Sequence, residues 1–548
     1  MLKVPVRVTV VLALGAGPLA AQPADSLRLA VNRVFAPWTN SDGPGCAVGV
    51  SRDGNVVFQN GYGMANLETD TPITANSVFH VASVSKQFTA MAIMLLAREG
   101  KLSLDDDVRR HLPELPDYGH KITIRHLLQH TSGLRDQWDL LFMARGRFEE
   151  NRINEDDVLE IVTRQKALNF TPGAEYVYSN TGYTLAGTIV RRVSGKSLRD
   201  FADERIFKPL GMTNTHFHDD YTMVVKGRAA GYARGSDNKW HVSLPNYDTY
   251  GATSLFTTVG DLLKWEANVW KPTVGDEPML REMRTSATLT SGDSTGYGLG
   301  LSTEVYRGAR LIGHGGADAG YRTYLGRMPL HTLGVVVLCN AATANPGALA
   351  RGVIDAYIGD KLTPVSSPAR PTVSIPTGQL ARYAGIYVNP VTGAPMLLTL
   401  RRDTLIVGRT VGPALVPINE RTFRLGTVTE LEFTPNGDLI QTVRAWPHPR
   451  PVTLKRHEPS KLSRADLDTF AGTYYSEELG STWTVKATDS TLVLRTRGGA
   501  ERTVRATYGD VFLGDFLLAF TRDRQRKVDG MLMSTGRVRN VRFVRALK

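Results

Sequence analysis

Two residues three positions apart, Ser83 and Lys86, form the first pattern in this sequence that could support catalysis. They open an apolar run that stops before Gly100, so both should lie on one face of the first turn of a buried helix. Burial and the positive end of the helix dipole disfavour a protonated amine, so Lys86 could remove the Ser83 proton at neutral pH. Ser85 is a competing nucleophile by composition, but it should point elsewhere because it directly precedes Lys86.

A second motif, Tyr178-Ser179-Asn180, stands between a turn signal and a run with helical spacing. A tyrosine hydroxyl near Lys86 could relay a proton to a leaving group. The Asn180 amide could hold either Lys86 or a substrate carbonyl. The same three residues would also fit a plain turn with a packed aromatic ring.

The third motif, His314-Gly315-Gly316-Ala317, enters a predicted strand. Glycines let a substrate lie close against strand backbone, whose amides can then point at it. His314 could donate a hydrogen bond to a substrate or be an ordinary polar strand residue. A tight bulge without a catalytic part is the alternative for the glycines.

Together, the three motifs resemble the catalytic signature of the serine beta-lactamase and penicillin-recognising superfamily. The tyrosine and asparagine of the middle motif are similar to the class C beta-lactamase-like branch. Supporting sequence surrounds each motif, and the resemblance extends over roughly residues 40–345. The supporting segments are residues 79–83, 100–106, 126–134 and 209–212.

This resemblance implies a fold and a set of roles. The implied fold is α+β, a beta-lactamase/transpeptidase-like catalytic domain with an antiparallel sheet flanked by helices and an all-helical subdomain. Ser83 is implied to be the acylated nucleophile, with Lys86 and Tyr178 sharing the proton transfers. The other implied site residues are Asn180, His314 and Gly316 as substrate contacts, and the backbone amides of Ser83 and Ala317 as the oxyanion hole. The family implies no metal and no cofactor.

One departure from the family pattern bears on the substrate. His314-Gly315-Gly316 stands where beta-lactamases and penicillin-binding proteins carry Lys-Thr-Gly, whose lysine faces the substrate carboxylate. A neutral histidine offers less positive charge, and His-x-Gly resembles the D-aminopeptidases, D-amino-acid amidases and some esterases of the family. The expected function is therefore an exported serine hydrolase of small amides, peptides or esters, resembling a D-aminopeptidase or D-amino-acid amidase with esterase side activity.

Two other functions stay open. One is a class C-type beta-lactamase or D,D-carboxypeptidase, which His314 disfavours. The other is a non-catalytic protein that binds cell-wall peptides. Loss of Ser83, Lys86 or Tyr178 would have indicated such a protein, and all three are present.

The elements that must position these motifs lie in residues 22–362, the predicted catalytic domain. Residues 46–58 predict two strands joined by a turn at Asp53-Gly54, and residues 321–328 and 333–340 predict two more. Helical spacing follows residue 25, Thr258 and Pro346. Strands at both ends with helices between them indicate one sheet whose strands are far apart in sequence.

A proline-rich segment, residues 363–376, predicts an extended linker. The chain after it repeats itself: residues 383–387, 403–407 and 433–434 match residues 470–474, 490–494 and 520–521, each pair at the same offset. We therefore expect two small antiparallel β-barrel domains, residues 377–457 and 458–548. Neither carries an obvious catalytic set. In the D-stereospecific aminopeptidases that the chain resembles, a loop from such barrels approaches the active site; here the barrels could gate the cleft, bind envelope material or mediate dimerisation.

Composition limits the remaining options. The 548 residues are 42 % hydrophobic and 22 % charged, ordinary values for a globular protein of several domains. The net charge of +12 is spread along the chain without an aromatic-interleaved basic stripe, so we expect no nucleic-acid partner. The pairs His126/His130 and His216/His218 have the spacing of metal ligands, but we expect structural histidines.

The first 21 residues predict a cleaved signal peptide, since Lys3 and Arg7 precede an apolar run and small residues. The run is too short to be a comfortable membrane anchor, so a periplasmic or secreted protein is expected. Cys46 and Cys339 both lie in apolar strand-like runs. They could pair in an oxidising compartment, but we expect free buried cysteines.

Overall fold

The computed structural model describes residues 23–145, 152–364, 373–426, 429–443, 450–496 and 499–546. The predicted signal peptide, residues 1–21, lies outside the described residues. Residues 365–372, most of the predicted linker, also lie outside them.

A six-stranded antiparallel sheet organises the first part of the chain, in the order β10-β11-β12-β13-β1-β2. Its centre pairs β13 with β1, although 280 residues separate them along the sequence, as predicted. The predicted turn Asp53-Gly54 joins β1 to β2, and both residues have the positive φ that such a hairpin turn requires. The strands are β1 (Cys46–Arg52), β2 (Asn55–Tyr62), β10 (Ser302–Tyr306), β11 (Ala309–Asp318), β12 (Tyr321–Met328) and β13 (Leu333–Cys339).

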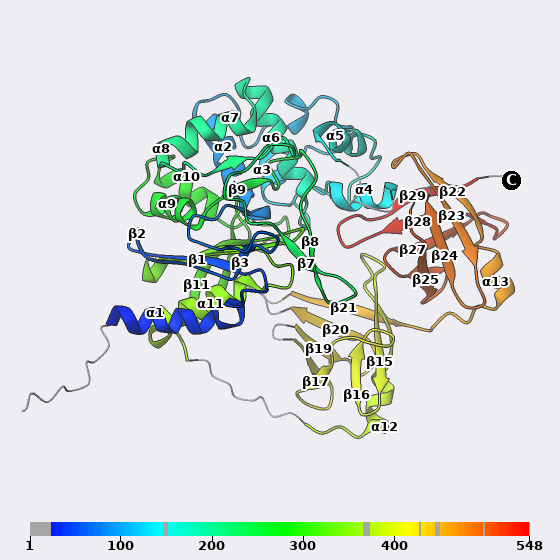
Figure 1. Ribbon diagram of the computed structural model, residues 1–548. Helices are drawn as coiled ribbons and strands as arrows, with labels where there is room; N and C mark the ends of the chain where they lie inside the picture. Colours follow the sequence, from blue (N-terminus) through cyan, green and yellow to red (C-terminus); the bar gives the residue numbers. More distant parts are fainter. Residues whose placement is uncertain are drawn as a thin grey trace, which may run out of the picture.

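Helices cover both faces of this sheet (Figure 1). All seven residues of β13 are buried: Val335 and Val337 pack toward α1 and α11, while Val336 and Leu338 pack into the core formed with α2 and α9. This explains why the strand reads as one unbroken apolar run. The helices are α1 (Pro23–Val34), α2 (Lys86–Arg98), α3 (Ile124–Leu128), α4 (Gln137–Arg145), α5 (Glu155–Thr163), α6 (Asn180–Ser194), α7 (Leu198–Ala202), α8 (Lys208–Leu210), α9 (Val259–Trp270), α10 (Glu277–Arg284) and α11 (Pro346–Ile358).

Helix α2 is the buried helix that the apolar run predicts. Every residue from Lys86 to Leu96 is buried, and the chain leaves the helix through Gly100, whose φ is +69°. Phe88 packs on Trp265 of α9 with ring centroids 4.8 Å apart. A helix without a polar face holds its first residue, Lys86, inside the protein. The short strands beside these helices are β3 (Met64–Asn66), β4 (Thr71–Pro72), β5 (Phe79–His80), β6 (His216–Phe217), β7 (Tyr232–Arg234), β8 (Trp240–Val242) and β9 (Leu255–Thr257).

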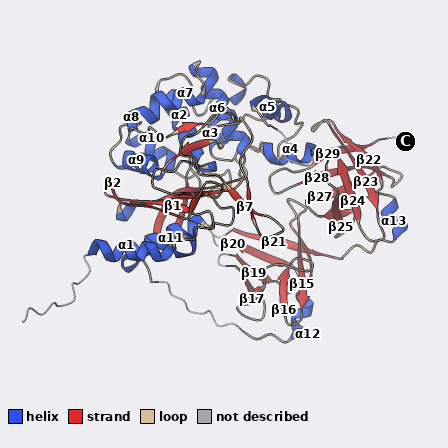
Figure 2. Cartoon of the chain, in the orientation of Figure 1, coloured by secondary structure: helices blue, strands red, loops and turns tan. Residues whose placement is uncertain are grey.

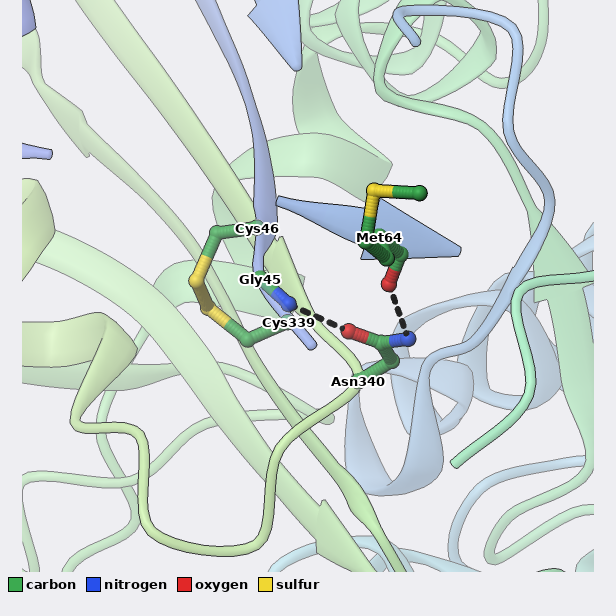
Figure 3. The surroundings of a disulfide bond; sticks show 5 residues. All are labelled: Gly45, Cys46, Met64, Cys339 and Asn340. Carbon is green, nitrogen blue, oxygen red and sulfur yellow. Dashed lines mark hydrogen bonds between the residues drawn. A yellow bond between two sulfur atoms is a disulfide. The ribbon is translucent and has the colours of Figure 1, made fainter. Parts of the chain in front are cut away.

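The expectation of free cysteines is wrong. Cys46 and Cys339 face each other in the β1–β13 register and form a disulfide (Figure 3). Beside the disulfide, the Asn340 side chain connects the same segments: it accepts a hydrogen bond from the Gly45 amide at 2.8 Å and donates one to the Met64 carbonyl at 3.0 Å. The strand assignment was right, but only the register of the two strands brings the sulfur atoms together.

The remainder of the chain folds almost entirely as strands (Figure 2). Eight strands form a barrel-like sheet whose end strands approach through a bridge between Ile406 and Ala414, and the next eight form a closed barrel. These are β14 (Gly385–Val388), β15 (Pro395–Arg401), β16 (Thr404–Val407), β17 (Leu415–Pro417), β18 (Thr422–Leu425), β19 (Thr429–Phe433), β20 (Leu439–Val443) and β21 (Arg450–His457), then β22 (Gly472–Ser476), β23 (Ser481–Ala487), β24 (Leu492–Thr496), β25 (Arg502–Ala506), β26 (Val511–Leu513), β27 (Leu517–Arg522), β28 (Val528–Ser534) and β29 (Val541–Arg545). Helices α12 (Thr377–Leu380) and α13 (Arg464–Asp468) precede the two sheets.

The sequence repeat corresponds to a repeated hydrogen bond in the two barrels. Tyr387 donates its hydroxyl to the Tyr383 carbonyl at 3.0 Å, and Tyr474 donates to the Phe470 carbonyl at 2.7 Å. Both donor tyrosines are fully buried. A buried tyrosine needs a hydrogen-bond partner for its hydroxyl. The matching residues of the two copies provide that partner in the same way, through a backbone carbonyl four residues earlier.

The closed barrel packs against the helical side of the first part of the chain, next to α4 (Figure 1). Trp483 is fully buried and donates its indole N–H to the Met143 carbonyl at 2.8 Å. Arg135 and Glu478 form a buried ion pair across the same contact, with an N–O distance of 2.5 Å. Apolar burial and a paired charge therefore fix this barrel beside the helices.

Candidate active site

Ser83 lies in the 3₁₀ turn Ala82–Ser85, immediately before α2. The preceding Ala82 has φ of +48°, a left-handed conformation that costs a non-glycine residue roughly 1–2 kcal/mol. Ser85 points away, as expected: its hydroxyl donates to the Ala82 carbonyl at 2.5 Å and accepts from the Leu255 amide at 3.0 Å. Of these two serines, Ser83 is the one that lines the cavity described below.

The Lys86 amine is fully buried and touches three oxygen atoms. Its Nζ lies 3.1 Å from Ser83 Oγ, 2.9 Å from Asn180 Oδ1 and 2.6 Å from the Ala252 carbonyl oxygen. The amide and carbonyl oxygens carry no hydrogen, so a neutral amine must donate its two N–H groups to them. Its lone pair then faces the Ser83 hydroxyl, the one neighbour of the three that can donate.

Burial lowers the pKa of Lys86 from its ordinary value to about 7. The negative charge of Asp136 opposes this shift, and the positive charge of Arg537 adds to it. A substantial fraction of the amine is therefore unprotonated at neutral pH, which the apolar helix start predicts. This lysine can accept a proton where an exposed one could not.

Tyr178 lies over the same amine, with Lys86 Nζ 4.9 Å from its ring centroid. Burial raises the pKa of Tyr178, and a hydrogen bond with the Ser83 side chain opposes that shift. The phenol is therefore neutral and can donate a proton. His130 packs against the ring with centroids 4.2 Å apart, which holds the tyrosine in place.

Asp136 is a site residue that the sequence analysis missed. Its Oδ2 accepts hydrogen bonds from the Asn180 backbone amide at 2.6 Å and from Asn180 Nδ2 at 2.9 Å. These contacts aim the Asn180 Oδ1 atom at Lys86. Asp136 is fully buried, yet its neighbours in sequence are polar and give no periodic signal of burial.

His314 and Gly316 lie on β11, opposite Ser83. Gly316 fits only without a side chain, because a Cβ there would lie 2.4 Å from the Val81 carbonyl oxygen. His314 Nε2 lies 2.9 Å from the Tyr297 hydroxyl and Nδ1 lies 2.6 Å from the Gly315 carbonyl oxygen. Burial lowers the pKa of His314 to about 4, so the ring is uncharged at neutral pH.

A cavity of about 1160 Å³ gathers the three motifs. The structure thus brings together the predicted residues Ser83, Lys86, Tyr178, Asn180, His314, Gly316 and Ala317. Trp138 and Ile153 supply one wall from the segment of residues 135–169, which carries no readable motif. Arg537, from the loop between β28 and β29, supplies another part, so a barrel loop does approach the site.

The predicted histidine pairs have structural contacts. His126 Nδ1 accepts from the Thr123 amide at the start of α3, and His130 Nδ1 accepts from the Ser179 amide at 3.2 Å. His216 stacks on Phe256 with ring centroids 5.8 Å apart. Within the described ranges, no group of three or more His, Cys, Asp or Glu side chains is placed to hold a metal ion.

Comparison with known proteins identifies a matching family and several similar proteins. Residues 31–359 match the family model described as Beta-lactamase. The chain is 26 % identical over 469 residues to the D-aminopeptidase of Brucella ovis, which covers 85 % of this chain and 84 % of the relative. It is 29 % identical over 412 residues to penicillin-binding protein 4* of Bacillus subtilis, covering 71 % and 90 %. Among solved structures, the octameric penicillin-binding protein homologue from Pyrococcus abyssi matches with a TM-score of 0.56 and 24 % identity over 79 % of this chain and 100 % of that one.

Proposed function

The chain belongs to the beta-lactamase family, and we propose that it is a serine hydrolase that cleaves the amide bonds of small D-amino-acid peptides and amides. The observation that carries this proposal is the Lys86 amine, buried 3.1 Å from Ser83 Oγ with its other two contacts fixed as acceptors. A base held in this way lowers the barrier to attack by the serine hydroxyl.

Acylation begins when Ser83 Oγ attacks the substrate carbonyl carbon and its proton passes to neutral Lys86. The negative oxygen that forms is stabilised by the backbone amides of Ser83 and Ala317. Among the described strands, β10 pairs with β11 only as far as Gly313, which leaves one edge of the following residues facing the cavity. This exposed edge supports the assignment of Ala317 to the oxyanion hole.

Collapse of the tetrahedral intermediate breaks the bond to the leaving nitrogen. Tyr178, neutral because burial raises its pKa, donates a proton to that nitrogen and recovers one from protonated Lys86. A water molecule then attacks the acyl-enzyme, giving its proton to Lys86, and the acid leaves as Ser83 regains a hydrogen. Asn180 holds Lys86 through its Oδ1 and contacts the substrate amide from the cavity wall.

The third motif favours an amidase over a beta-lactamase. A cation at position 314 would pair with the carboxylate of a lactam antibiotic, but His314 is neutral and uses both ring nitrogens within the protein. The name of the relative from Brucella ovis, D-aminopeptidase, supports the D-amino-acid substrate. Simple esters should also react, because their leaving groups depart more easily than amines.

The relative from Bacillus subtilis supports a second candidate, a D,D-carboxypeptidase or beta-lactamase. In that case the substrate carboxylate must be met by a group outside the third motif. A non-catalytic role as a binding protein for cell-wall peptides is disfavoured, because the acid–base geometry around Ser83 is intact.

An exported location fits this function. The basic and apolar start of the chain and the Cys46–Cys339 disulfide both support an oxidising compartment outside the cytoplasm. Across the described ranges, no helix is long and apolar enough to cross a membrane. We propose no nucleic-acid partner. We propose that the two barrels could mediate a homodimer.

One rate panel tests the function: D-alanine p-nitroanilide, its L-isomer, p-nitrophenyl butyrate and nitrocefin, with Ser83→Ala as the blank. Cleavage of the D-anilide and not the L-anilide supports the proposal. If butyrate alone is hydrolysed, the protein is an esterase. If nitrocefin is the best substrate, the protein is a beta-lactamase. If no compound is turned over, the binding-protein hypothesis is favoured.

A further inference from the structure

The side chains that line the cavity around Ser83 include more cations than anions. Among the described residues that line it, the charged side chains are Asp318, Arg322 and Arg537, two cations against one anion. His314 adds no charge at neutral pH. A substrate with an anionic group would therefore be attracted to this cavity.

Two of the three charged groups already have hydrogen-bond partners within the protein. Asp318 accepts hydrogen bonds from the hydroxyls of Tyr247 and Thr253. Arg322 donates from Nη1 to two backbone carbonyl oxygens at 2.9 and 2.7 Å. Asp318 and Arg322 therefore use hydrogen-bonding groups on contacts within the cavity wall.

Among the described residues, the Arg537 guanidinium has only a long ion pair, with the fully buried Asp136 carboxylate. Within the part of the chain that the structure describes, it makes no hydrogen bond to a protein acceptor; its nearest carboxylate oxygen, on Asp136, is 4.0 Å from Nη1, too far for one. Its carbon lies 4.9 Å from the centroid of the Tyr178 ring, and its side chain is 44 % exposed. A guanidinium has five N–H donors, so this group faces the cavity with its donors unused.

The backbone that carries this side chain is fixed. The Arg537 carbonyl accepts from Asn169 Nδ2 at 2.8 Å, and two residues further Arg539 pairs with both carboxylate oxygens of Glu175 at 3.1 and 2.9 Å. Thr535, two residues earlier, donates its hydroxyl to Asp139 at 2.5 Å. The loop is thus held on the catalytic side by three separate contacts, and Arg537 is presented to the cavity between them.

We infer that Arg537 is a specificity-determining residue, which binds a carboxylate of the substrate and so supplies from the closed barrel the positive charge that the third motif lacks. The inference deepens the proposed function and rests on it. The substrate class that follows is a D-amino-acid amide or short peptide bearing a carboxylate, either on the acyl side chain or on the leaving group. An arginine suits this role because it can make two parallel hydrogen bonds to a carboxylate.

The test uses two pairs of substrates that differ by one carboxylate. D-alanine 3-carboxy-4-nitroanilide against D-alanine p-nitroanilide places the charge on the leaving group. The p-nitroanilides of D-glutamate and D-glutamine, joined through the α-carboxyl, place it on the acyl side chain. The readout is the ratio of kcat/KM within each pair, for the wild type, Arg537→Gln and Arg537→Lys.

Arg524→Gln is the matched control, because it removes the same charge from the same barrel. Arg524 lies in the turn before β28, whereas Arg537 follows β28, so the strand's seven residues separate them by about 23 Å. Circular dichroism and thermal unfolding of each variant check that the barrel stays folded and docked.

The wild type should prefer the carboxylated member of at least one pair. Arg537→Gln should lower that preference by about tenfold or more, the size of one charge-assisted hydrogen bond, and Arg537→Lys should restore part of it. Arg524→Gln should leave the ratio unchanged. An absent preference in the wild type, or an equal loss on both members in Arg537→Gln, would overturn the inference.

Binding separates this inference from the proposed function. In the Ser83→Ala background no turnover is needed, and calorimetry with the same pairs, with and without Arg537→Gln, measures the carboxylate contact directly. If the enzyme cleaves none of the anilides but the binding ratio still depends on Arg537, the proposed reaction fails and the binding site stands. If the anilides are cleaved and the binding ratio is indifferent to Arg537, the reaction stands and this inference fails.

Discussion

Replacing Asp136 with asparagine should damage both the stability and the activity of the enzyme. One carboxylate oxygen accepts two hydrogen bonds from Asn180, and the other accepts from the backbone amides of Trp138 and Asp139 at 3.0 and 3.4 Å. Asparagine has a single acceptor oxygen, so in either orientation its NH₂ group faces a pair of N–H donors. Leaving such buried donors without an acceptor costs about 1–3 kcal/mol.

The same substitution should change the kinetics in two ways. Asn180 loses part of its anchor, so the Lys86 amine is held less well, and the plateau of kcat/KM should fall by about tenfold to a hundredfold. The Asp136 charge raises the pKa of Lys86, so its removal should lower that pKa. The acid limb of the pH profile should therefore move to lower pH.

Two assays check this prediction. Chemical denaturation measures the change in the free energy of unfolding, and D-alanine p-nitroanilide hydrolysis from pH 5 to 9 gives the plateau and the acid limb. Glu160→Gln, an exposed carboxylate on α5, is the control for loss of a negative charge. If Asp136→Asn matched that control in stability, plateau and acid limb, the role assigned to Asp136 would be refuted.

Three further predictions follow from the same contacts. Wild-type kcat/KM should fall about tenfold per pH unit below about pH 7, because the active form has neutral Lys86; a flat profile down to pH 5 would exclude Lys86 as the base. Gly316→Ala should lower kcat by at least about tenfold and the free energy of unfolding by about 1–3 kcal/mol, because the new Cβ would push away the Val81 carbonyl beside the Ser83 turn, and an unchanged kcat would contradict this. Glu478→Gln should lower the free energy of unfolding by about 3–5 kcal/mol, measured by urea denaturation, because it leaves Arg135 buried without its counterion; a loss below about 1 kcal/mol would mean that water replaces the pair.

The sequence predicts most of the catalytic sheet, for a physical reason. Strand β12 has its predicted range, although it mixes apolar and polar residues. Strand β13 matches its predicted range closely, because a strand buried on both faces must be apolar throughout. Helix α2 is predicted for the same reason, and with it the burial of Lys86. A long apolar run must be buried, and this restricts the positions in the fold that it can occupy.

What the sequence does not predict depends on contacts between distant segments. The Cys46–Cys339 disulfide follows from a strand register, which the two apolar runs leave undetermined. Asp136 looks like a surface residue until the fold places Asn180 against it. Arg537 is one of many scattered basic residues, and only the docking of the closed barrel brings it to the cavity. In each case the local sequence is compatible with several environments, and tertiary structure selects one.

The claim that Ser83 is activated by Lys86 can be tested most directly by covalent labelling. The protein is treated with a fluorophosphonate, and the modified peptide is identified by mass spectrometry in the wild type, Ser83→Ala and Lys86→Ala. The account predicts a single adduct on Ser83 whose rate of formation rises through about pH 7. It also predicts no adduct in Ser83→Ala and much slower labelling in Lys86→Ala. An adduct on Ser85, or a labelling rate that does not depend on Lys86, would contradict it.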